Sequence, residues 1–591
     1  MTLNLVHQTL LSCGYRYTAA RELPDNIILN NKDRRVGYYL KDFNTKLGDF
    51  TVALKIWKDP HIKLPSAFII KIPSVLHNKL IPHISIEGIL CYIEQMEADW
   101  DPNDIPTTYC EVDFQIGQTI DNAILSLSSN ADDKRELEGE FSSYWRPMET
   151  LFLLSKIDKN NSFKTKLSTS VWPDSSPRLE YISISCEEIN QNDIIVKWLK
   201  QRYLNENTLN TDEIPTHIIN VKPSRLSGTN WPPLSFKKLL EWLAIIDHNA
   251  RNKVIEKIIT YGNKRNIFLF DVFKQDTIAA YIEIDKNHID LNRYKKNKKR
   301  NKKYSILNIS EVIGGKNVCI DFKRLDVIKA DIDTLLSRNL PRQKIDNLSN
   351  KNIALIGCGT VGGYLSDLLI KNGAGSGSGK LDLYDDDNYS PHNFSRHILT
   401  MDYFNKNKAK SLEMQLKKSI HLNTNIHGYA EQFPLNISKL YLYDIIIDAT
   451  GRPPLSKRMA YLLREISLKK RPLVIHAFND GNGRASKVFI DNGNCCYGCM
   501  ISNCEKYSNG IDKRFLKLDL DKEKLKSCGS TYTPYDASVS QITASLTQTA
   551  LLNSLGTEIQ WTYYEHILDG SRPYKPQIIT RQDNCKICYG K

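Results

Sequence analysis

The sequence lacks any long hydrophobic run, which excludes a membrane-spanning helix. No segment of the 591-residue chain approaches the roughly 18 uninterrupted apolar residues that a span needs. The first residues, from Met1 to Gly14, also lack the basic start and the small-residue cleavage site of a secretory signal. We therefore expect a soluble, cytoplasmic protein with no membrane partner.

The sequence also lacks internal repeats and low-complexity linkers, so a repeat architecture is excluded and domain boundaries have to come from motifs. A usual domain has about 100–200 residues, so 591 residues predict three or four of them. We divide the chain into an N-terminal domain (1–150), a linker domain (151–345) and a C-terminal domain (346–591).

Much of the excess positive charge is local. The formal net charge is +13, from 80 Lys and Arg against 67 Asp and Glu, and residues 293–303 (RYKKNKKRNKK) form the densest basic run. The run lies between strand-like segments at 277–285 and 304–309, which favours a solvated hairpin loop. A contact with nucleic acid or an acidic protein is the alternative, and we expect no nucleic-acid partner.

The linker domain has no recognisable chemical motif. Its pattern predicts a helix over 236–259 and strands over 266–273 and 317–325, so we expect an α/β fold there.

From residue 346 onward the sequence predicts a doubly wound parallel sheet. The apolar strand Ile353–Ile356 is followed by a glycine turn and a helix, and KLDLYDDD follows as the next strand. The turn fits G-x-G-x-x-G at Gly357, Gly359 and Gly362, where the backbone can approach a phosphate and the helix N-terminus offers N–H groups. Asp385 ends the next strand, where a carboxylate can accept hydrogen bonds from ribose hydroxyls. Up to this point an NAD enzyme would look the same.

Polar residues after that strand favour a triphosphate over a dinucleotide. Asp387, Asn393, Arg396 and, after a short gap, Lys408 follow in order. An Asn, an Arg and a Lys beside one glycine turn are suited to clamping a triphosphate, whereas backbone N–H groups usually hold a dinucleotide's pyrophosphate. The combined spacing, across about 240 residues, resembles the ThiF/MoeB family, the adenylating domain of ubiquitin-activating enzymes.

That resemblance implies an ATP site. The residues against the nucleotide, the ribose and the phosphates would be Gly357, Gly359, Gly362, Asp385, Asn393, Arg396 and Lys408, with Arg396 also serving catalysis. The family usually places a Mg²⁺-binding Asp in a later D-x-T-D motif, but here DIIIDATG has Asp448 and, in that position, Gly451. Mg²⁺ would then be bound by Asp387, by Asp448 or by the phosphates themselves.

Two C-x-x-C knuckles, Cys496–Cys499 and Cys585–Cys588, predict a metal site. Two such pairs form a tetrahedral four-thiolate site, and a closed site of this kind holds a structural zinc. ThiF/MoeB proteins carry a zinc in this arrangement, and the CYGC motif of this sequence resembles theirs. A redox pair is the alternative, which we disfavour because neither knuckle is expected to open a helix of thioredoxin type. Cys495 and Cys504 are expected to be spare thiols. The cysteines in strand-like or apolar contexts are expected to be core thiols: Cys13, Cys110, Cys186 and Cys319.

Cys528 follows a Lys-rich loop (505–527) and precedes a long helix predicted to begin near Ala537. Cationic neighbours and a nearby helix start favour a thiolate, which suits a nucleophile. An incidental loop thiol is the alternative. In the ubiquitin-activating branch of the family a cysteine in this region takes the acyl group from the adenylate as a thioester, and the resemblance implies that role for Cys528.

The N-terminal domain alternates strand-like runs (50–57 and 66–72) with turns before a helix predicted at 118–128, so we expect a small α+β unit.

One segment of this domain, PHISIEGILC, ends at Cys91. It resembles the active-site segment of ubiquitin-conjugating enzymes, in which a His, a short turn and G-x-[IL]-C precede a helix, and Trp100-x-Pro102 is also similar to that family. The resemblance covers about 130 residues and implies that Cys91 holds a thioester. The family's His-Pro-Asn is Pro-His-Ile here, so its Asn is absent, and by itself the domain also fits a buried packing cysteine at this position.

The two resemblances support each other, because an activating domain makes a thioester and a conjugating domain is its usual acceptor. The domain order is similar to that of bacterial fusion proteins of CBASS antiphage systems. This resemblance implies that the C-terminal carboxylate of a cGAS-like nucleotidyltransferase is adenylated, captured by Cys528, passed to Cys91 and joined to a lysine-bearing target protein or a small amine. His83 is a candidate to assist Cys91. Because ThiF/MoeB domains pair symmetrically, we expect a homodimer.

Two other functions stay open from the sequence. A sulfur-carrier-protein adenylyltransferase of cofactor biosynthesis shares the C-terminal half but has no need of Cys91. A non-catalytic scaffold would bind ATP without turnover and use the basic run to hold a partner.

Overall fold

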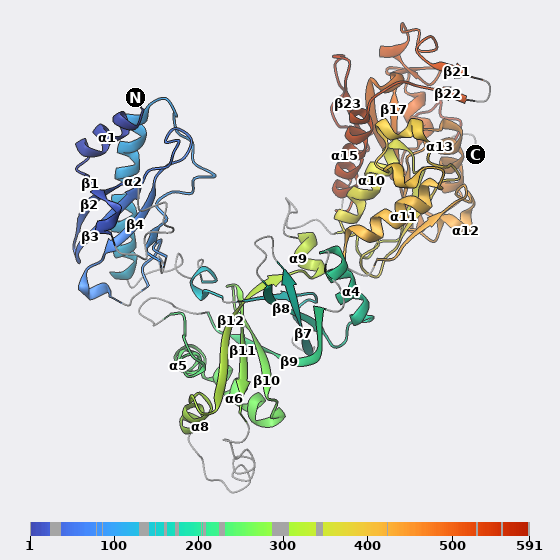
Figure 1. Cartoon of the computed structure of the whole chain (residues 1–591). Coiled ribbons are helices and arrows are strands. Elements are labelled where there is room, and N and C mark those ends of the chain that lie inside the picture. The colour runs from blue at the N-terminus through green and yellow to red at the C-terminus, as the bar shows by residue number, and fades with distance from the viewer. Residues whose placement is uncertain are drawn as a thin grey trace. The chain divides into compact units, whose positions relative to one another are not determined.

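The computed structural model contains two compact units (Figure 1). The first comprises residues 1–153, 157–187 and 209–328, and the second comprises 154–156, 188–208 and 329–591. The structure describes residues 2–23, 37–77, 80–85, 87–128, 141–147, 149–158, 162–171, 177–202, 204, 208–223, 231–285, 306–337, 347–421, 424–527, 530–556 and 559–588. The division into domains at residues 150 and 345 stays a prediction.

The N-terminal part of the first unit is an antiparallel sheet with two helices packed on it (Figure 1). The strands follow in chain order: β1 (Arg16–Ala19), β2 (Gly37–Thr45), β3 (Gly48–Lys55), β4 (Ser66–Lys71) and β5 (Ile89–Leu90). Helices α1 (Thr2–Ser12) and α2 (Ile105–Ser128) bury Leu10 and Ile116 against Phe50 and Val52 of β3. The α+β fold is therefore confirmed, and the helix predicted at 118–128 is the C-terminal half of α2.

The rest of the first unit contains a closed seven-stranded barrel in the order β10-β11-β12-β6-β8-β7-β9. Its strands are β6 (Glu149–Leu153), β7 (Phe163–Val171), β8 (Pro177–Ser185), β9 (Leu209–Val221), β10 (Arg265–Val272), β11 (Thr277–Ile284) and β12 (Cys319–Lys329). Successive residues of β10 point to opposite faces, so Leu269 fills the barrel while Phe270 packs under α5 (Phe236–Ile246) and α6 (His248–Tyr261). Strands and helices thus share one core, as the α/β prediction required.

Two predictions for the linker region are wrong. The helix predicted over 236–259 is broken at Asp247, whose side chain accepts hydrogen bonds from the N–H groups of Asn249 and Ala250 and so starts a second helix. The segment predicted as a strand at 304–309 instead enters the helix α8 (Ile306–Ile313). The basic run 293–303 lies outside the described residues.

The second unit is built on a seven-stranded sheet in the order β15-β14-β13-β16-β17-β18-β23, in which the first five strands are parallel and the last two pairings, β17 with β18 and β18 with β23, are antiparallel. These strands are β13 (Ile353–Ile356), β14 (Leu381–Tyr384), β15 (Ile426–Tyr429), β16 (Ile445–Asp448), β17 (Leu473–Asp480), β18 (Ala485–Asp491) and β23 (Tyr563–Ile567). The helices are α4 (Gln191–Gln201), α9 (Ile332–Ser337), α10 (Thr360–Lys371), α11 (Lys408–Ser419), α12 (Ile437–Leu440), α13 (Pro453–Leu463), α14 (Tyr497–Ser502) and α15 (Ala537–Asn553).

Helices cover both faces of this sheet. Leu355 of β13 packs with α10, α11 and α15, whereas its neighbour Ile356 packs with α12 and α13 on the other face. The predicted doubly wound sheet is therefore confirmed. Among the described residues, no helix combines the length and the apolar character that crossing a membrane requires.

Candidate active site

The glycine turn connects β13 to α10, and the space around a side chain differs at its three glycine positions. A Cβ at Gly362 would lie 1.9 Å from the carbonyl oxygen of Gly357, and Gly357 has a φ of +88° with Thr450 only 3.0 Å from its Cβ position. A Cβ at Gly359 would meet no atom within 4 Å. Packing therefore requires the first and third glycines, while the second leaves an open cradle at the N-terminus of α10. This cradle fits a nucleotide phosphate, which such a helix end attracts.

Asp385 follows β14 and is tied to the glycine turn. Its carboxylate accepts hydrogen bonds from the N–H of Cys358 at 2.6 Å and from the N–H of Asp387 at 2.9 Å. Burial raises the pKa of Asp385 above its ordinary value. The carboxylate thus lies at the carboxyl edge of the sheet beside the turn, where a ribose would be bound.

Lys408 is the first residue of α11 and is almost fully buried, yet it reaches the same edge of the sheet. Its Nζ lies 2.8 Å from Oδ2 of Asp387, whose side chain is 75% exposed. The backbone of Lys408 also donates to the carbonyl oxygen of Asp387 at 3.0 Å. The structure therefore places this lysine beside the D-x-D segment.

Asn393 and Arg396 lie on the short helix η8 (Pro391–Arg396). Asn393 Oδ1 accepts a hydrogen bond from the N–H of Ser390 at 3.0 Å and so caps this helix. Arg396 donates from Nη1 to the carbonyl oxygen of Thr533 at 3.0 Å, and its guanidinium carbon lies 4.7 Å from the centre of the Tyr535 ring. Arg396 therefore contacts the segment that leads into α15.

Asp448 ends β16 and is buried, with both carboxylate oxygens engaged by protein groups. Oδ1 accepts from the hydroxyl of Thr450 at 2.7 Å, and Oδ2 accepts from the hydroxyl of Ser456 at 2.6 Å and from Nδ1 of His476 at 2.9 Å. These hydrogen bonds hold the pKa of Asp448 below its ordinary value in spite of burial. Of the two carboxylates considered for Mg²⁺, only the exposed Asp387 fits an ion without breaking buried hydrogen bonds.

Sequence reasoning missed three residues of this edge. His476 holds Asp448, Tyr535 stacks on Arg396, and His397 donates from Nε2 to the carbonyl oxygen of Cys358 at 2.9 Å. His397 directly follows the N-x-x-R pattern, and this position is the only local sequence feature that could have indicated its place in the site.

The four knuckle cysteines form one cluster in the second unit. Their sulfur atoms all lie within 4.8 Å of one another, with the shortest separations between 3.4 and 3.8 Å. A tetrahedron with zinc–sulfur bonds of about 2.3 Å has sulfur–sulfur edges of about 3.8 Å, so the donor set fits a zinc ion. A Cβ at Gly498 would lie 2.9 Å from Cys585 Sγ, which explains the glycine inside the first knuckle.

Other cysteine predictions are corrected. Cys496 is the N-cap residue of α14, so the first knuckle does open a short helix, and the argument against a redox pair is instead the convergence of four sulfurs. Cys110 and Cys186 are exposed, so neither is a core thiol, whereas Cys13 and Cys319 are half-buried and pack against hydrophobic cores. The loop before Cys528 also has more structure than predicted, including β19 (Tyr507–Ser508), β20 (Ile511–Asp512) and β21 (Leu525–Ser527).

The structure describes one of the two predicted thioester cysteines, Cys91, but not the other, Cys528. Cys91 is exposed directly after β5, and its N–H donates to the carbonyl oxygen of His83 at 2.8 Å, so it is no buried packing residue. His83 has a φ of +62°, which makes the chain turn sharply before Gly88. Cys528 lies outside the described residues, between β21 and β22 (Ser530–Tyr532).

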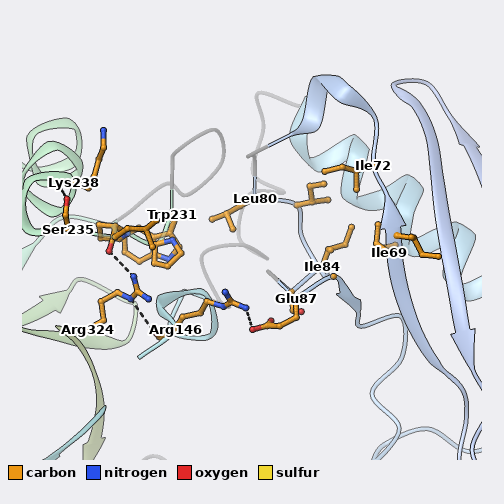
Figure 2. A pocket seen from close by; sticks show the side chains of 17 residues that line it. Ile69, Ile72, Leu80, Ile84, Glu87, Arg146, Trp231, Ser235, Lys238 and Arg324 are labelled. Carbon is orange, nitrogen blue, oxygen red and sulfur yellow. Dashed lines mark hydrogen bonds and ion pairs between the residues drawn. The ribbon is translucent and has the colours of Figure 1, made fainter. Parts of the chain in front are cut away.

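The loop before Cys91 also lines a pocket of about 960 Å³ within the first unit (Figure 2). Its apolar wall includes Ile69, Ile84 and Trp231, while Arg146 pairs with Glu87 at its edge. Cys91 is not among the residues that line it.

Comparisons with known proteins show what this chain is similar to. Residues 13–154 match the Prokaryotic E2 family B, and residues 333–573 match the ThiF family. The ATP-dependent ubiquitin transferase-like protein Cap2 of Escherichia coli (strain TW11681) is 54% identical over 99% of this chain and 98% of that protein. The protein of the same name from Vibrio cholerae serotype O1 is 48% identical over 99% of each chain. A crystal structure of E. coli MccB with MccA-N7isoASN is 19% identical, covers 41% of this chain and 68% of that chain, and has a TM-score of 0.31.

The two resemblances drawn from the sequence are thus confirmed for the N-terminal and C-terminal parts. One chain combines a conjugating-type domain with an adenylating-type domain, which makes it an enzyme of ubiquitin-like activation and conjugation. This chain belongs to the family of Cap2 ATP-dependent ubiquitin transferase-like proteins.

Proposed function

We propose that this enzyme activates the C-terminal carboxylate of a cGAS-like nucleotidyltransferase and joins it to a lysine-bearing target protein or a small amine, as part of CBASS antiphage defence in the cytoplasm. The observation that supports this proposal most is the union of a conjugating-type domain with exposed Cys91 and a glycine-turn site in one chain. A sulfur-carrier adenylyltransferase does not need a conjugating-type domain. A non-catalytic scaffold does not need Cys91 or Cys528.

The first step is adenylation. A carboxylate oxygen of the donor attacks the α-phosphorus of ATP, a new oxygen–phosphorus bond forms, and pyrophosphate leaves. Lys408 and Arg396 balance the negative charge that grows on the leaving phosphates, while the N–H groups at the start of α10 bind phosphate beside Gly359. Asp385 holds the ribose, and the side-chain nitrogen of Asn393 reaches the phosphates while its oxygen caps η8.

Metal ions have separate places in this proposal. Asp387 would hold Mg²⁺ in exchange for its ion pair with Lys408, and the ion would neutralise phosphate charge. Asp448 positions Thr450 behind Gly357 and stays a structural carboxylate. The four knuckle cysteines would hold a zinc ion, which would stabilise the fold around α14.

The second stage is a thioester relay. The Cys528 thiolate attacks the acyl carbon and releases AMP, and Cys91 then takes the acyl group by thioester exchange, which is nearly isoenergetic. A target amine finally displaces the Cys91 thiolate and forms an amide. His83 is placed by its main chain beside Cys91 and is a candidate to assist this last step. The ThiF-type domain pairs as a homodimer.

The test is the mass of the intact protein after incubation with MgATP and a cGAS-like nucleotidyltransferase. We expect a thiol-sensitive adduct whose mass equals that of the donor less one water. A donor that lacks its last residues is the matched control and should give no adduct. ATP binding without any adduct on either cysteine would favour the scaffold, and persulfide formation would favour the sulfur-carrier enzyme.

A further inference from the structure

The segment between β22 and α15 touches two parts of the proposed nucleotide site. Arg396 binds the carbonyl oxygen of Thr533 at 3.0 Å, and the ring of Tyr535 lies 4.7 Å from the guanidinium carbon of Arg396. The hydroxyl of Tyr535 also lies 3.3 Å from that of Thr360, the first residue of α10. One half-buried tyrosine therefore links the arginine to the helix end that follows the glycine turn.

The position of Tyr535 is fixed from its other side by the turn between β17 and β18. A Cβ at Gly483 would lie 2.7 Å from Cβ of Tyr535, and Gly483 has a φ of +90°, so any other residue there would push the tyrosine away. The same turn holds the chain ahead of β21, because Arg484 makes a two-bond ion pair with Glu523 at 2.7 and 2.8 Å. The chain on either side of the β21–β22 hairpin is thus anchored to one turn.

The contact between Tyr535 and Arg396 suits an arginine that has to bind phosphate. A guanidinium can stack on an aromatic ring through its face while its edge binds an anion, and stacking limits the rotamers that it would otherwise explore. The ring therefore orients Arg396 without taking the place of the phosphate. A lysine could not be oriented in this way, because its ammonium group has no planar face.

We propose that Tyr535 is a positioning residue that orients Arg396 toward the triphosphate and couples binding of the nucleotide to the order of segment 533–536. It acts through Arg396, by way of its ring, and contacts no reacting atom. This inference rests on the proposed ATP site and adds to it the residue that connects that site with the chain leading to α15.

The test uses the full-length protein and AMPPNP with Mg²⁺, so no acyl donor is needed. The affinity is measured by calorimetry, and hydrogen–deuterium exchange is followed in peptides that cover 530–540. In the wild type, AMPPNP should slow exchange in these peptides. Tyr535→Phe keeps the ring and should bind within about twofold of the wild type, whereas Tyr535→Leu should bind about three- to tenfold more weakly and lose most of the protection.

Two further variants separate positioning from a general loss of structure. Arg396→Lys keeps the charge but has no face to stack, so it should weaken binding to a similar extent, and adding Tyr535→Leu to it should cost little more. Tyr441→Leu, at a tyrosine that is 46% exposed on another part of the unit, is the matched control and should behave as the wild type.

The possible outcomes are distinct. Wild-type affinity and protection in Tyr535→Leu would overturn the inference, and so would additive losses in the double variant. Failure of the wild type to bind AMPPNP would instead overturn the proposed ATP site.

Discussion

The Nζ atom of Lys408 lies 2.8 Å from Oδ2 of Asp387, and this pair joins a nearly buried ammonium to a carboxylate that is mostly exposed. The ammonium is held in place by the fold at the start of α11, whereas the carboxylate can turn toward solvent. When nucleotide binds, a phosphate can therefore pair with Lys408 while Mg²⁺ pairs with Asp387, so that each charged side chain keeps a partner of opposite charge.

The first prediction follows from this pair. Lys408→Ala removes a charge-assisted contact with the leaving phosphates and should raise the adenylation barrier by about 2–4 kcal/mol, or roughly 30- to 1000-fold. The measurement is ATP–pyrophosphate exchange in the presence of the acyl donor. Lys410→Ala, two positions along the same helix and more exposed, is the control. Exchange at the wild-type rate in Lys408→Ala would sink the assignment.

The second prediction concerns zinc. The protein as purified should hold one zinc ion per chain, and Cys499→Ser should lose the ion and lower the melting temperature, because the metal binds only the folded state. Cys504→Ser is the control, since Cys504 is exposed and lies outside the four-sulfur cluster. Elemental analysis that finds no zinc in protein kept away from chelators would contradict this prediction.

The third prediction is a pH dependence at His397. Its Nδ1 accepts from the N–H of Leu399 and its Nε2 donates to the carbonyl oxygen of Cys358, so the buried ring is neutral, and burial lowers its pKa to about 4. Between about pH 6.5 and 4 the unfolded chain binds a proton at this residue that the folded chain does not. The free energy of unfolding therefore falls as the pH falls through this window, by at most about 1.4 kcal/mol per pH unit.

His397→Gln should lose less stability than the wild type between pH 7 and pH 5, as measured by the difference in melting temperature. His217 in the first unit also has a pKa lowered to about 4 by burial, but it is present in both proteins and cancels in the comparison. Equal losses in the two proteins would refute the role of His397.

The fourth prediction concerns oxidation in the conjugating-type domain. Cys13 Sγ, just after α1, lies 3.5 Å from Sγ of Cys110 in α2. Oxidised glutathione should convert the pair to a disulfide by exchange, with a loss of two hydrogens and a higher melting temperature, because the closed loop restricts the unfolded chain. Cys110→Ser should prevent the change and Cys186→Ser should not. Peptide mapping that finds both thiols reduced would rule it out.

The positions of much of the candidate adenylating site in the fold could be predicted from local sequence. The glycines, Asp385 and Lys408 follow strands or begin helices of a parallel sheet, and the carboxyl ends of such strands meet at one edge. The contacts that could not be predicted join distant segments. Arg396 meets Thr533 across 137 positions and His476 meets Asp448 across 28, and no periodicity encodes which loop folds back onto the site.

The errors have equally specific causes. The apolar pattern runs on through Asp247 and so predicts one helix, although Asp is a strong N-cap residue and here starts a second helix. The strand-like or apolar contexts of Cys110 and Cys186 predict core thiols, but both are exposed, because only the packing decides which face of an element is buried.

The last prediction is the order of the relay. If Cys528 accepts the acyl group before Cys91, then Cys91→Ala should still form a thiol-sensitive adduct on Cys528. Cys528→Ala should form none on either cysteine and yet still exchange pyrophosphate. Cys91→Ser should accumulate an adduct that survives thiol but yields to hydroxide, because an oxygen ester is more stable than a thioester. Cys504→Ser is the control and should behave as the wild type. Peptide mass spectrometry gives the position of the acyl group, and finding it on Cys110 or Cys504, with Cys91 and Cys528 unmodified, would overturn both assignments.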